Sequence, residues 1–346
     1  MKMLAAKGIV PGCPAADALA VVVLLADSTI SEVRAQALST LDNLPKPLLD
    51  GALGGQVHAR VLLALAATHG NDLEVLPRLL GMASMIEEAL CLLADRATEP
   101  AGEIIATNEA LMLRFPGAIE KLYMNKRVRM STADRLIELA VRNDLDLDFP
   151  AFRLAAQAIA NQLIPEPTEE PTFDDQLFVE TDEVAESLAI DPRVEDVVDE
   201  DEEGQEQVKE KFTPLFQQLQ EMTISQRIRT ATLGNATARL FLVRDPNRLV
   251  AEAAVRSPRL TESEAAQIAA SRAVTEDVLR IVASSRDLTR SYQVKLNLIT
   301  NPRTPFTFSS RLLPHLREND LRGLARSKNV PGAIVRAAKQ QLSRKG

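Results

Sequence analysis

The second half of the sequence repeats a short turn pattern. Each copy has a Ser, two variable residues that often include an Arg, an aliphatic residue and then a Thr. The copies at residues 257–262, 271–276 and 285–290 are 14 residues apart, and looser copies occur at 301–305 and 327–331. A spacing of 14 residues fits one turn plus one helix of about ten residues. The pattern therefore predicts a series of short helices.

The chemistry of the repeat explains why a helix should begin at each copy. Thr261 with Glu264 has the form of a capping box, in which each side chain accepts a hydrogen bond from the other residue's main-chain N–H, and Thr223 with Gln226 has the same form. One apolar position also recurs seven residues after the Thr of each copy, at Ile268, Val282 and Leu296. We expect this position to form one buried stripe that continues from helix to helix.

Composition favours the same all-α class. Aromatic residues make up 3% of the chain and Trp is absent, which argues against a β-sandwich or β-barrel. No run alternates apolar and polar residues long enough to indicate a strand. Residues 1–165 contain several short apolar stretches separated by Pro, Gly and Asn. We predict six to nine short helices in each of two blocks.

Charge divides the chain into three segments. Residues 1–165 hold 15 Lys and Arg against 19 Asp and Glu, residues 166–211 hold 3 against 19, and residues 212–346 hold 22 against 10. Like charges at this density oppose collapse. We therefore predict two helical domains, 1–165 and 211–346, joined by an acidic disordered linker over 166–210. The few apolar residues of this linker are either residual composition or a short motif that folds on a partner.

Signatures of catalysis are missing. The three histidines are scattered, and the sequence has no Cys-x-x-Cys, no His-Glu-x-x-His and no Gly-x-Ser-x-Gly. The Gly-rich stretch 51–55 lacks the Lys-Ser/Thr that a phosphate-binding loop needs. We expect a protein that is not an enzyme, with no catalytic residue, no metal site and no cofactor.

The cysteines and the apolar runs bear on location. Two cysteines, Cys13 and Cys91, cannot form a disulfide framework for 346 residues, so we expect free thiols and a cytoplasmic protein. The most apolar run, residues 18–26, is too short to span a bilayer, which needs about 20 residues. We therefore expect no membrane span.

Three stretches carry a resemblance to a known class. They are Asn-Pro-Arg-Thr-Pro at 301–305, Arg-Asp-Pro-Asn-Arg-Leu-Val at 244–250, and the closing run from 312 to 331. Over residues 212–345 the chain resembles bacterial α-solenoids of the HEAT/armadillo or leucine-rich-variant type, including uncharacterised bacterial helical-repeat proteins. The resemblance implies stacked helical repeats and a habit of binding other macromolecules, and it implies no catalytic residue.

Basic residues follow the repeated turns and crowd the last helices. The candidate anion-facing residues are Arg259, Arg272, Arg286, Arg303, Arg311, Arg317, Arg322, Arg326, Lys328, Arg336 and Lys339. If the turns line up, the first of these form a row along one edge, or two rows if successive helices alternate edges. The row is either an ordinary solvated edge with a basic cap or a surface for an anionic partner.

Two functions follow from this layout. The first is a protein-interaction scaffold or adaptor whose partner is acidic where it meets the C-terminal block, with an oligomeric state that the sequence leaves open. The alternative is binding to the nucleic-acid backbone, which the net charge of −8 and the scarcity of aromatics disfavour. A helical-repeat DNA glycosylase is disfavoured for the same lack of aromatics. The acidic linker could also dock on the basic block and inhibit binding until a partner displaces it.

Overall fold

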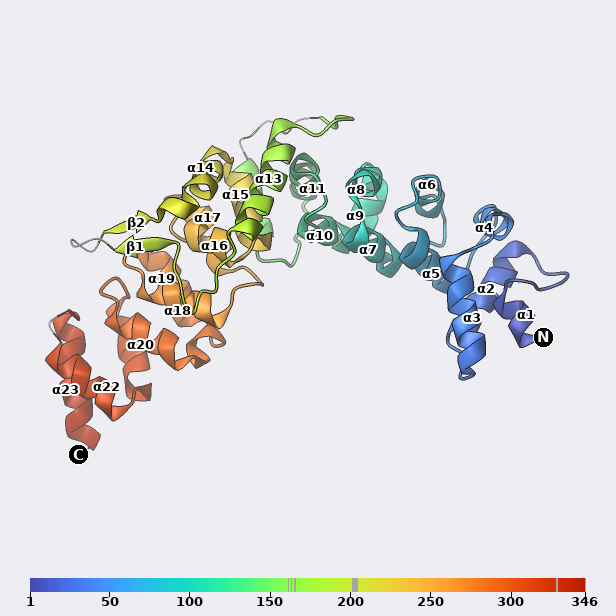
Figure 1. The fold of residues 1–346 in the computed structure, drawn as a ribbon. Helices are drawn as coiled ribbons and strands as arrows, with labels where there is room; N and C mark the ends of the chain where they lie inside the picture. Colours follow the sequence, from blue (N-terminus) through green and yellow to red (C-terminus); the bar gives the residue numbers. More distant parts are fainter. Residues whose placement is uncertain (161, 163, 165, 201–204, 328, 346) are drawn as a thin grey trace. The chain divides into compact units, whose positions relative to one another are not determined.

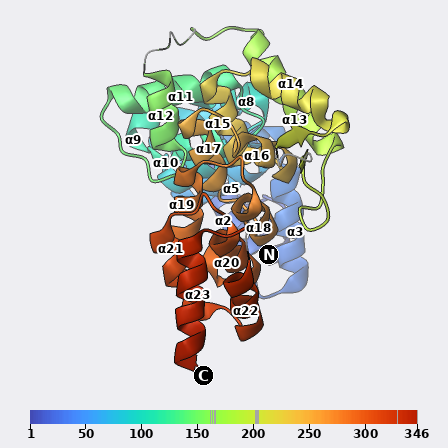
Figure 2. The ribbon, with the colours of Figure 1, turned by 90° about the vertical axis from the view of Figure 1, so that its left-hand side faces the viewer.

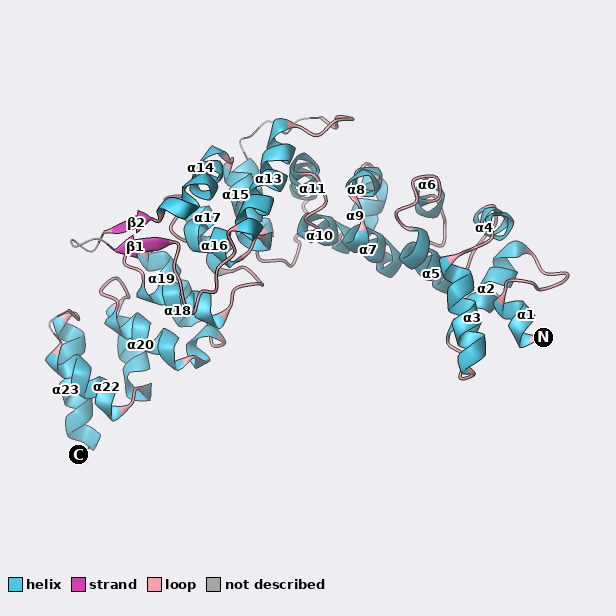
Figure 3. Cartoon of the chain, in the orientation of Figure 1, coloured by secondary structure: helices cyan, strands magenta, loops and turns pink. Residues whose placement is uncertain are grey.

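The computed structural model describes residues 1–160, 162, 164, 166–200, 205–327 and 329–345, and this part of the chain is helical apart from one small hairpin (Figures 1 and 3). It divides into two compact units. Unit 1 comprises Met1–Leu147 and Ile164–Pro167, and unit 2 comprises Asp148–Leu163 and Thr168–Gly346. The prediction of an all-α fold is confirmed.

The helices of unit 1 are α1 (Lys2–Ala6), α2 (Ala15–Ala26), α3 (Ser31–Asp42), α4 (Lys46–Leu53), α5 (Ala59–His69), α6 (Leu76–Leu80), α7 (Glu87–Arg96), α8 (Glu99–Ala106), α9 (Glu109–Arg114), α10 (Gly117–Met124) and α11 (Met130–Arg142). Unit 2 begins with α12 (Phe152–Ile159), α13 (Phe173–Ser187), strands β1 (Val198–Glu200) and β2 (Glu206–Val208), the 3-10 turn η1 (Glu210–Phe212) and α14 (Thr213–Glu221). It continues with α15 (Ile224–Leu233), α16 (Ala236–Leu242), α17 (Arg248–Val255), α18 (Glu262–Ala270), α19 (Glu276–Ser284), η2 (Leu288–Arg290), α20 (Tyr292–Thr300), α21 (Phe306–Leu312), η3 (Leu313–His315), α22 (Glu318–Arg326) and α23 (Gly332–Lys345).

These helices are more numerous than the six to nine that we predicted for each block. Several are shorter than the ten residues that the 14-residue spacing implies: α1 and α6 have five residues and α9 has six. Such short helices cannot bury an apolar face alone, so their stability must come from packing against neighbours.

In each unit, helices contact the next helix but one as well as the next. In unit 2, α15 packs on α17, α17 on α19 and α19 on α21, while α16 packs on α18 and α18 on α20. Figure 2 shows α19, α21 and α23 following one another on one side of this unit, with α18, α20 and α22 beside them. In unit 1, α5 packs on α7, α7 on α10 and α6 on α8. From α15 to α21, successive helices of unit 2 therefore belong to two alternating rows, whereas in unit 1 α8 and α9 lie between α7 and α10 in the sequence.

The predicted helix starts are present, with one exception. Thr223 and Thr261 each complete a capping box, with Gln226 and Glu264 respectively. Thr275 precedes α19 but its side chain makes no capping hydrogen bond. The third copy differs, because the turn η2 is inserted and α20 begins after Ser291, whose hydroxyl accepts a hydrogen bond from the Val294 N–H. The buried stripe accordingly holds Ile268 and Val282 and moves from Leu296 to Leu298 in α20.

Asparagine side chains connect the end of one helix to the end of an earlier one, two helices away in unit 2 and three in unit 1. The amide nitrogen of Asn301 donates to the carbonyl oxygens of Ala269 and Ser271, at 2.9 and 2.8 Å. In unit 1 the amide nitrogen of Asn125 donates to the carbonyl oxygens of Ala94 and Ala97, at 3.0 and 2.9 Å. Helix C-terminal carbonyls have no partner within their own helix. The same residue type thus satisfies them from the end of a later helix in both units, α20 for α18 and α10 for α7.

The expected disordered linker is not what the structure shows for the described part of 166–210. This segment contains α13 and the two strands, and most of it belongs to unit 2. Thr172 and Asp175 form a capping box that begins α13, and Leu177 and Phe178 are buried, with 4% and 5% of their surface exposed. The carboxylates of Glu195, Asp196 and Glu206 pair with basic residues of unit 2, and that of the buried Asp175 accepts hydrogen bonds from Thr172. Residues 201–204 lie outside the described residues.

None of the described helices combines the length and the apolar character needed to cross a bilayer.

Candidate functional site

A cluster of hydrogen bonds and ion pairs in unit 2 lies where the acidic segment meets the helices that follow it. We call residues 195–200 with 205–209 the acidic strap. β1 and β2 pair antiparallel within it, with Val198 opposite Val208 and Glu200 opposite Glu206. The strap is anchored by Val197, which is fully buried and whose carbonyl accepts a hydrogen bond from the Lys209 N–H at 3.1 Å.

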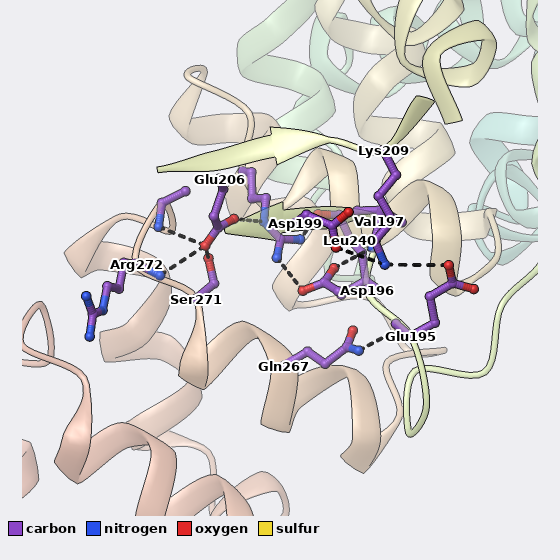
Figure 4. A network of polar contacts seen from close by, with 12 residues as sticks. Glu195, Asp196, Val197, Asp199, Glu206, Lys209, Leu240, Gln267, Ser271 and Arg272 are labelled. Carbon is purple, nitrogen blue, oxygen red and sulfur yellow. Dashed lines mark hydrogen bonds and ion pairs between the residues drawn. The ribbon is translucent and has the colours of Figure 1, made fainter. Parts of the chain in front are cut away.

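Glu206 of the strap is held by four donors (Figure 4). Its Oε2 accepts from Arg244 Nε at 2.6 Å. Its Oε1 accepts from the Ser271 hydroxyl at 2.6 Å and from the main-chain N–H groups of Arg272 and Ala273 at 3.1 and 3.3 Å. We call this set of donors the carboxylate cradle. Hydrogen bonds to a charged acceptor are stronger than neutral ones, so the cradle suits a carboxylate.

Local structure explains how the cradle forms. Arg244 follows the end of α16, and its Nη1 donates to the Leu240 carbonyl at 2.6 Å, which fixes the guanidinium against the helix that precedes it. Its Nη2 donates to Asp196 of the strap at 2.8 Å. The other three donors lie in the turn from α18 to α19, one of the predicted Ser-containing turns.

Burial and charge act on Glu206 in opposite directions. Only 6% of its side chain is exposed, and 9% of that of Arg244. Burial alone would raise the pKa of Glu206, but the charge of Arg244 and the hydrogen bonds from Ser271, Arg244 and the Ala273 N–H outweigh it and hold the pKa below its ordinary value. Glu206 is therefore a carboxylate in the folded protein near neutral pH.

Glu195, the first residue of the strap, holds it to neighbouring residues by ion pairs and a hydrogen bond. Its carboxylate pairs with Lys211 Nζ at 2.7 Å and with Lys209 Nζ at 3.5 Å, and its carbonyl accepts from Gln267 Nε2 at 2.7 Å. The hydrogen bond from Lys211, with the charges of the two lysines, holds the pKa of Glu195 below its usual range.

Helix α13 extends the same contact. Gln226 donates to the Asp174 carbonyl at 2.9 Å, and Asn235 donates to the Ala185 carbonyl at 2.6 Å. The guanidinium carbon of Arg229 lies 4.9 Å from the centre of the Phe178 ring. Side chains from α15 and the start of α16 thus bind the acidic segment along its main chain.

The structure places the predicted anion-facing residues in several settings. Arg259 donates to the Leu233 carbonyl, Arg303 to the Ala273 and Val274 carbonyls, and Arg311 to the Ala283 carbonyl. Arg272 meets the strap through its main-chain N–H, and its side chain is exposed. Arg317 lies over the Tyr292 ring, and Arg322 pairs with Glu318. Arg286, Arg326, Arg336 and Lys339 are exposed, and Lys328 lies outside the described residues.

The single row of arginines is replaced by two edges. Arg303 bonds to the turn that contains Arg272, so these two residues share an edge. The turn of Arg259 bonds instead to residues 232 and 233, and α18 separates it from the turn of Arg272. One helix lies between consecutive turns, and therefore turns 14 residues apart fall on opposite edges.

Sequence reasoning missed the two most important residues. Arg244 was noted only within the 244–250 stretch, and Glu206 was counted with the other acids of the linker. The signal that could have located the folded segment is Thr172 with Asp175, a capping pattern followed by apolar residues at 177, 178 and 185 that share a helical face. No sequence spacing indicates that Glu206 meets Arg244.

No protein-family model matches the chain, and no curated protein matches it. Among the described residues, no group of three His, Cys, Asp or Glu side chains is placed to hold a metal ion. Within this cluster, four donors hold one carboxylate of the same chain.

Proposed function

We propose that the chain is a non-enzymatic α-solenoid scaffold that binds an acidic segment of a partner protein on unit 2. In this proposal the acidic strap occupies the binding surface and inhibits it until a partner competes. The observation that carries the proposal is the cradle, in which four donors from two separate turns converge on one carboxylate.

The alternating helix rows support the solenoid part of the proposal. Helices of unit 2 that contact the next helix but one, with the Asn301 contact from the end of α20 to the end of α18, are what a stack of two-helix repeats requires. Each repeat then exposes its turns, where a partner can bind main-chain and side-chain donors.

The chemistry of the strap supports the partner class. The strap is extended, acidic and bound through main-chain as well as side-chain groups, as a linear peptide of another protein would be. Being tethered, it competes with any partner at an effective concentration in the millimolar range.

Binding to the nucleic-acid backbone has less support. Arg259, Arg303 and Arg311 each use a guanidinium N–H on a main-chain carbonyl, and acidic residues of the strap lie against the same unit. A labelled DNA duplex is therefore a suitable comparison probe in the test.

The test uses a fluorescein-labelled peptide with the sequence of residues 193–210 and measures its anisotropy with the full chain. Glu206→Lys, which should release the strap, is expected to bind the peptide about tenfold or more tightly than the wild type. Glu210→Lys makes the same charge change at an exposed position and should behave as the wild type does.

Ser271→Ala in the Glu206→Lys background should weaken peptide binding, because it removes one donor of the cradle. Equal affinity of the peptide for all variants, or tighter binding of the DNA duplex than of the peptide by Glu206→Lys, would overturn the proposed function.

A further inference from the structure

A second surface of unit 2 has the features of a binding site and shares no residue with the cradle. A cavity of about 590 Å³ opens between the turn before α21 and the start of α23. Its apolar lining comes from Pro302, Pro305, Phe306, Pro331, Ala333 and Ile334. We call it the Phe306 pocket. Its volume is within the range of about 300–1,000 Å³ typical of ligand sites.

The pocket offers an apolar contact that is already exposed. Half of the Phe306 surface is accessible, whereas Ile334 is 2% exposed and forms part of the core. An exposed aromatic ring beside a recess is a suitable contact for an apolar side chain of a partner. The prolines at 302, 305 and 331 restrict the main chain around the recess, so little ordering is needed on binding.

One arginine lines the pocket, and a second lies close to it. Arg303 lines it, and its Nη1 is directed to the carbonyls of Ala273 and Val274, which fixes the guanidinium at the rim. Arg336 lies at the start of α23, with its Nη1 3.9 Å from the position that a Cβ on Gly332 would occupy. The one acidic lining residue, Glu276, pairs with Arg280 of its own helix at 2.6 Å.

A buried hydroxyl completes the lining. Thr304 is 6% exposed, and its Oγ1 has no hydrogen-bond partner among the described residues. A buried hydroxyl without a partner is unfavourable, and an acceptor on a ligand would satisfy it.

We propose that the Phe306 pocket binds an acidic linear segment of a partner protein, which inserts an apolar side chain against Phe306 and places carboxylates beside Arg303 and Arg336. The proposal rests on the scaffold function only in that the partner is a protein.

The test uses the full wild-type chain, in which the strap fills the cradle. The probe is a fluorescein-labelled peptide of sequence Glu-Asp-Glu-Phe-Asp-Leu-Glu-Asp carrying a photo-crosslinking group. Two control peptides replace either both apolar residues by Ser or all acids by Gln. Fluorescence anisotropy should show saturable binding of the probe, weakened about tenfold or more in either control peptide.

Matched variants locate the site. Phe306→Asp should weaken binding about tenfold or more, and Arg336→Glu several-fold. Arg290→Glu makes the same charge change at a residue whose side chain is 82% exposed and which does not line the pocket, and it should leave binding unchanged. Crosslinks should map to 302–306 or 331–334.

Failure of this proposal is distinct from failure of the cradle. Three results would each overturn the pocket proposal. They are peptide binding that does not saturate, an equal loss of peptide affinity in Arg290→Glu and Arg336→Glu, and crosslinks confined to residues 244 and 271–273. The first two outcomes leave the cradle test with the 193–210 peptide unaffected, and the third would assign acidic-peptide binding to the cradle alone.

Discussion

Arg244 binds Glu206 with its Nε 2.6 Å from Oε2, and more than nine-tenths of each side chain is shielded from solvent. The two residues are 38 positions apart, one in the acidic strap and one at the end of α16. This pair, with the Ser271 turn, attaches the most acidic segment of the chain to its most basic part, residues 212–346.

Removing Arg244 should destabilise unit 2 strongly. Arg244→Gln leaves the buried Glu206 carboxylate without its charged partner, for which the expected loss of unfolding free energy is about 3–5 kcal/mol. Urea denaturation followed by circular dichroism measures the loss. The double variant Arg244→Met/Glu206→Leu should lose less, because it removes both charges of the buried pair and takes the contact with Arg244 only from the partly exposed Asp196. A loss below about 1 kcal/mol in Arg244→Gln would contradict the burial of this pair.

The contribution of Glu206 should depend on pH. Its pKa is lowered on folding, so its stabilisation is present in full above the ordinary glutamate pKa of about 4.3 and is lost as the pH falls through the lower folded pKa. The difference in unfolding free energy between wild type and Glu206→Gln, measured from pH 7 to pH 3, should be constant at first and then shrink. If the difference in unfolding free energy grows as the pH falls, folding raises the pKa of Glu206, contrary to this account.

Replacing Asn301 should lower the unfolding free energy more than replacing an exposed Asn. Asn301 is 4% exposed and satisfies two carbonyls, so Asn301→Ala should reduce the unfolding free energy by about 1–3 kcal/mol. Asn319→Ala, at an exposed position of α22, should change it by less than about 0.5 kcal/mol. Similar effects of the two substitutions in thermal or urea denaturation would argue against contacts between successive repeats.

The two thiols should differ in reactivity. Cys13 is exposed, whereas Cys91 is partly covered, and burial together with the charge of Glu87 raises the pKa of its thiol. Because the thiolate is the reactive form, a maleimide at neutral pH should label Cys13 quickly and Cys91 slowly. Mass spectrometry of Cys13→Ser should show only the slow reaction, and fast labelling in that variant would contradict the covered position.

The sequence predicted what depends on neighbouring residues and missed what depends on distant ones. The capping boxes at Thr223 and Thr261 and the burial of Ile268 and Val282 follow from spacings of a few residues, so they could be read directly. The fold of the strap could not be predicted in this way, because the sequence shows its acidic residues only as a group of like charges that repel one another. In the structure the carboxylates of Glu206 and Glu195 pair with basic side chains. The residue nearest in sequence that bonds to the Glu206 carboxylate is Arg244, 38 positions away.

The sequence left the arginines in either one row or two, for a related reason. A repeat of 14 residues contains one helix. Turns on the same edge of unit 2 are separated by two helices. Arg272 and Arg303 share an edge through a contact over about 30 residues, which the spacing of single turns does not reveal.

The measurement that tests the central claim most directly is hydrogen–deuterium exchange of the intact chain, read by mass spectrometry. If the acidic segment is folded on unit 2, amides of α13 should be protected to an extent similar to those of α15–α18, and Arg244→Gln should increase exchange in β1 and β2 more than in α13. Exchange of residues 173–187 within seconds, while α15–α18 stay protected, would contradict the account and return this segment to the disordered linker that its charge alone suggests.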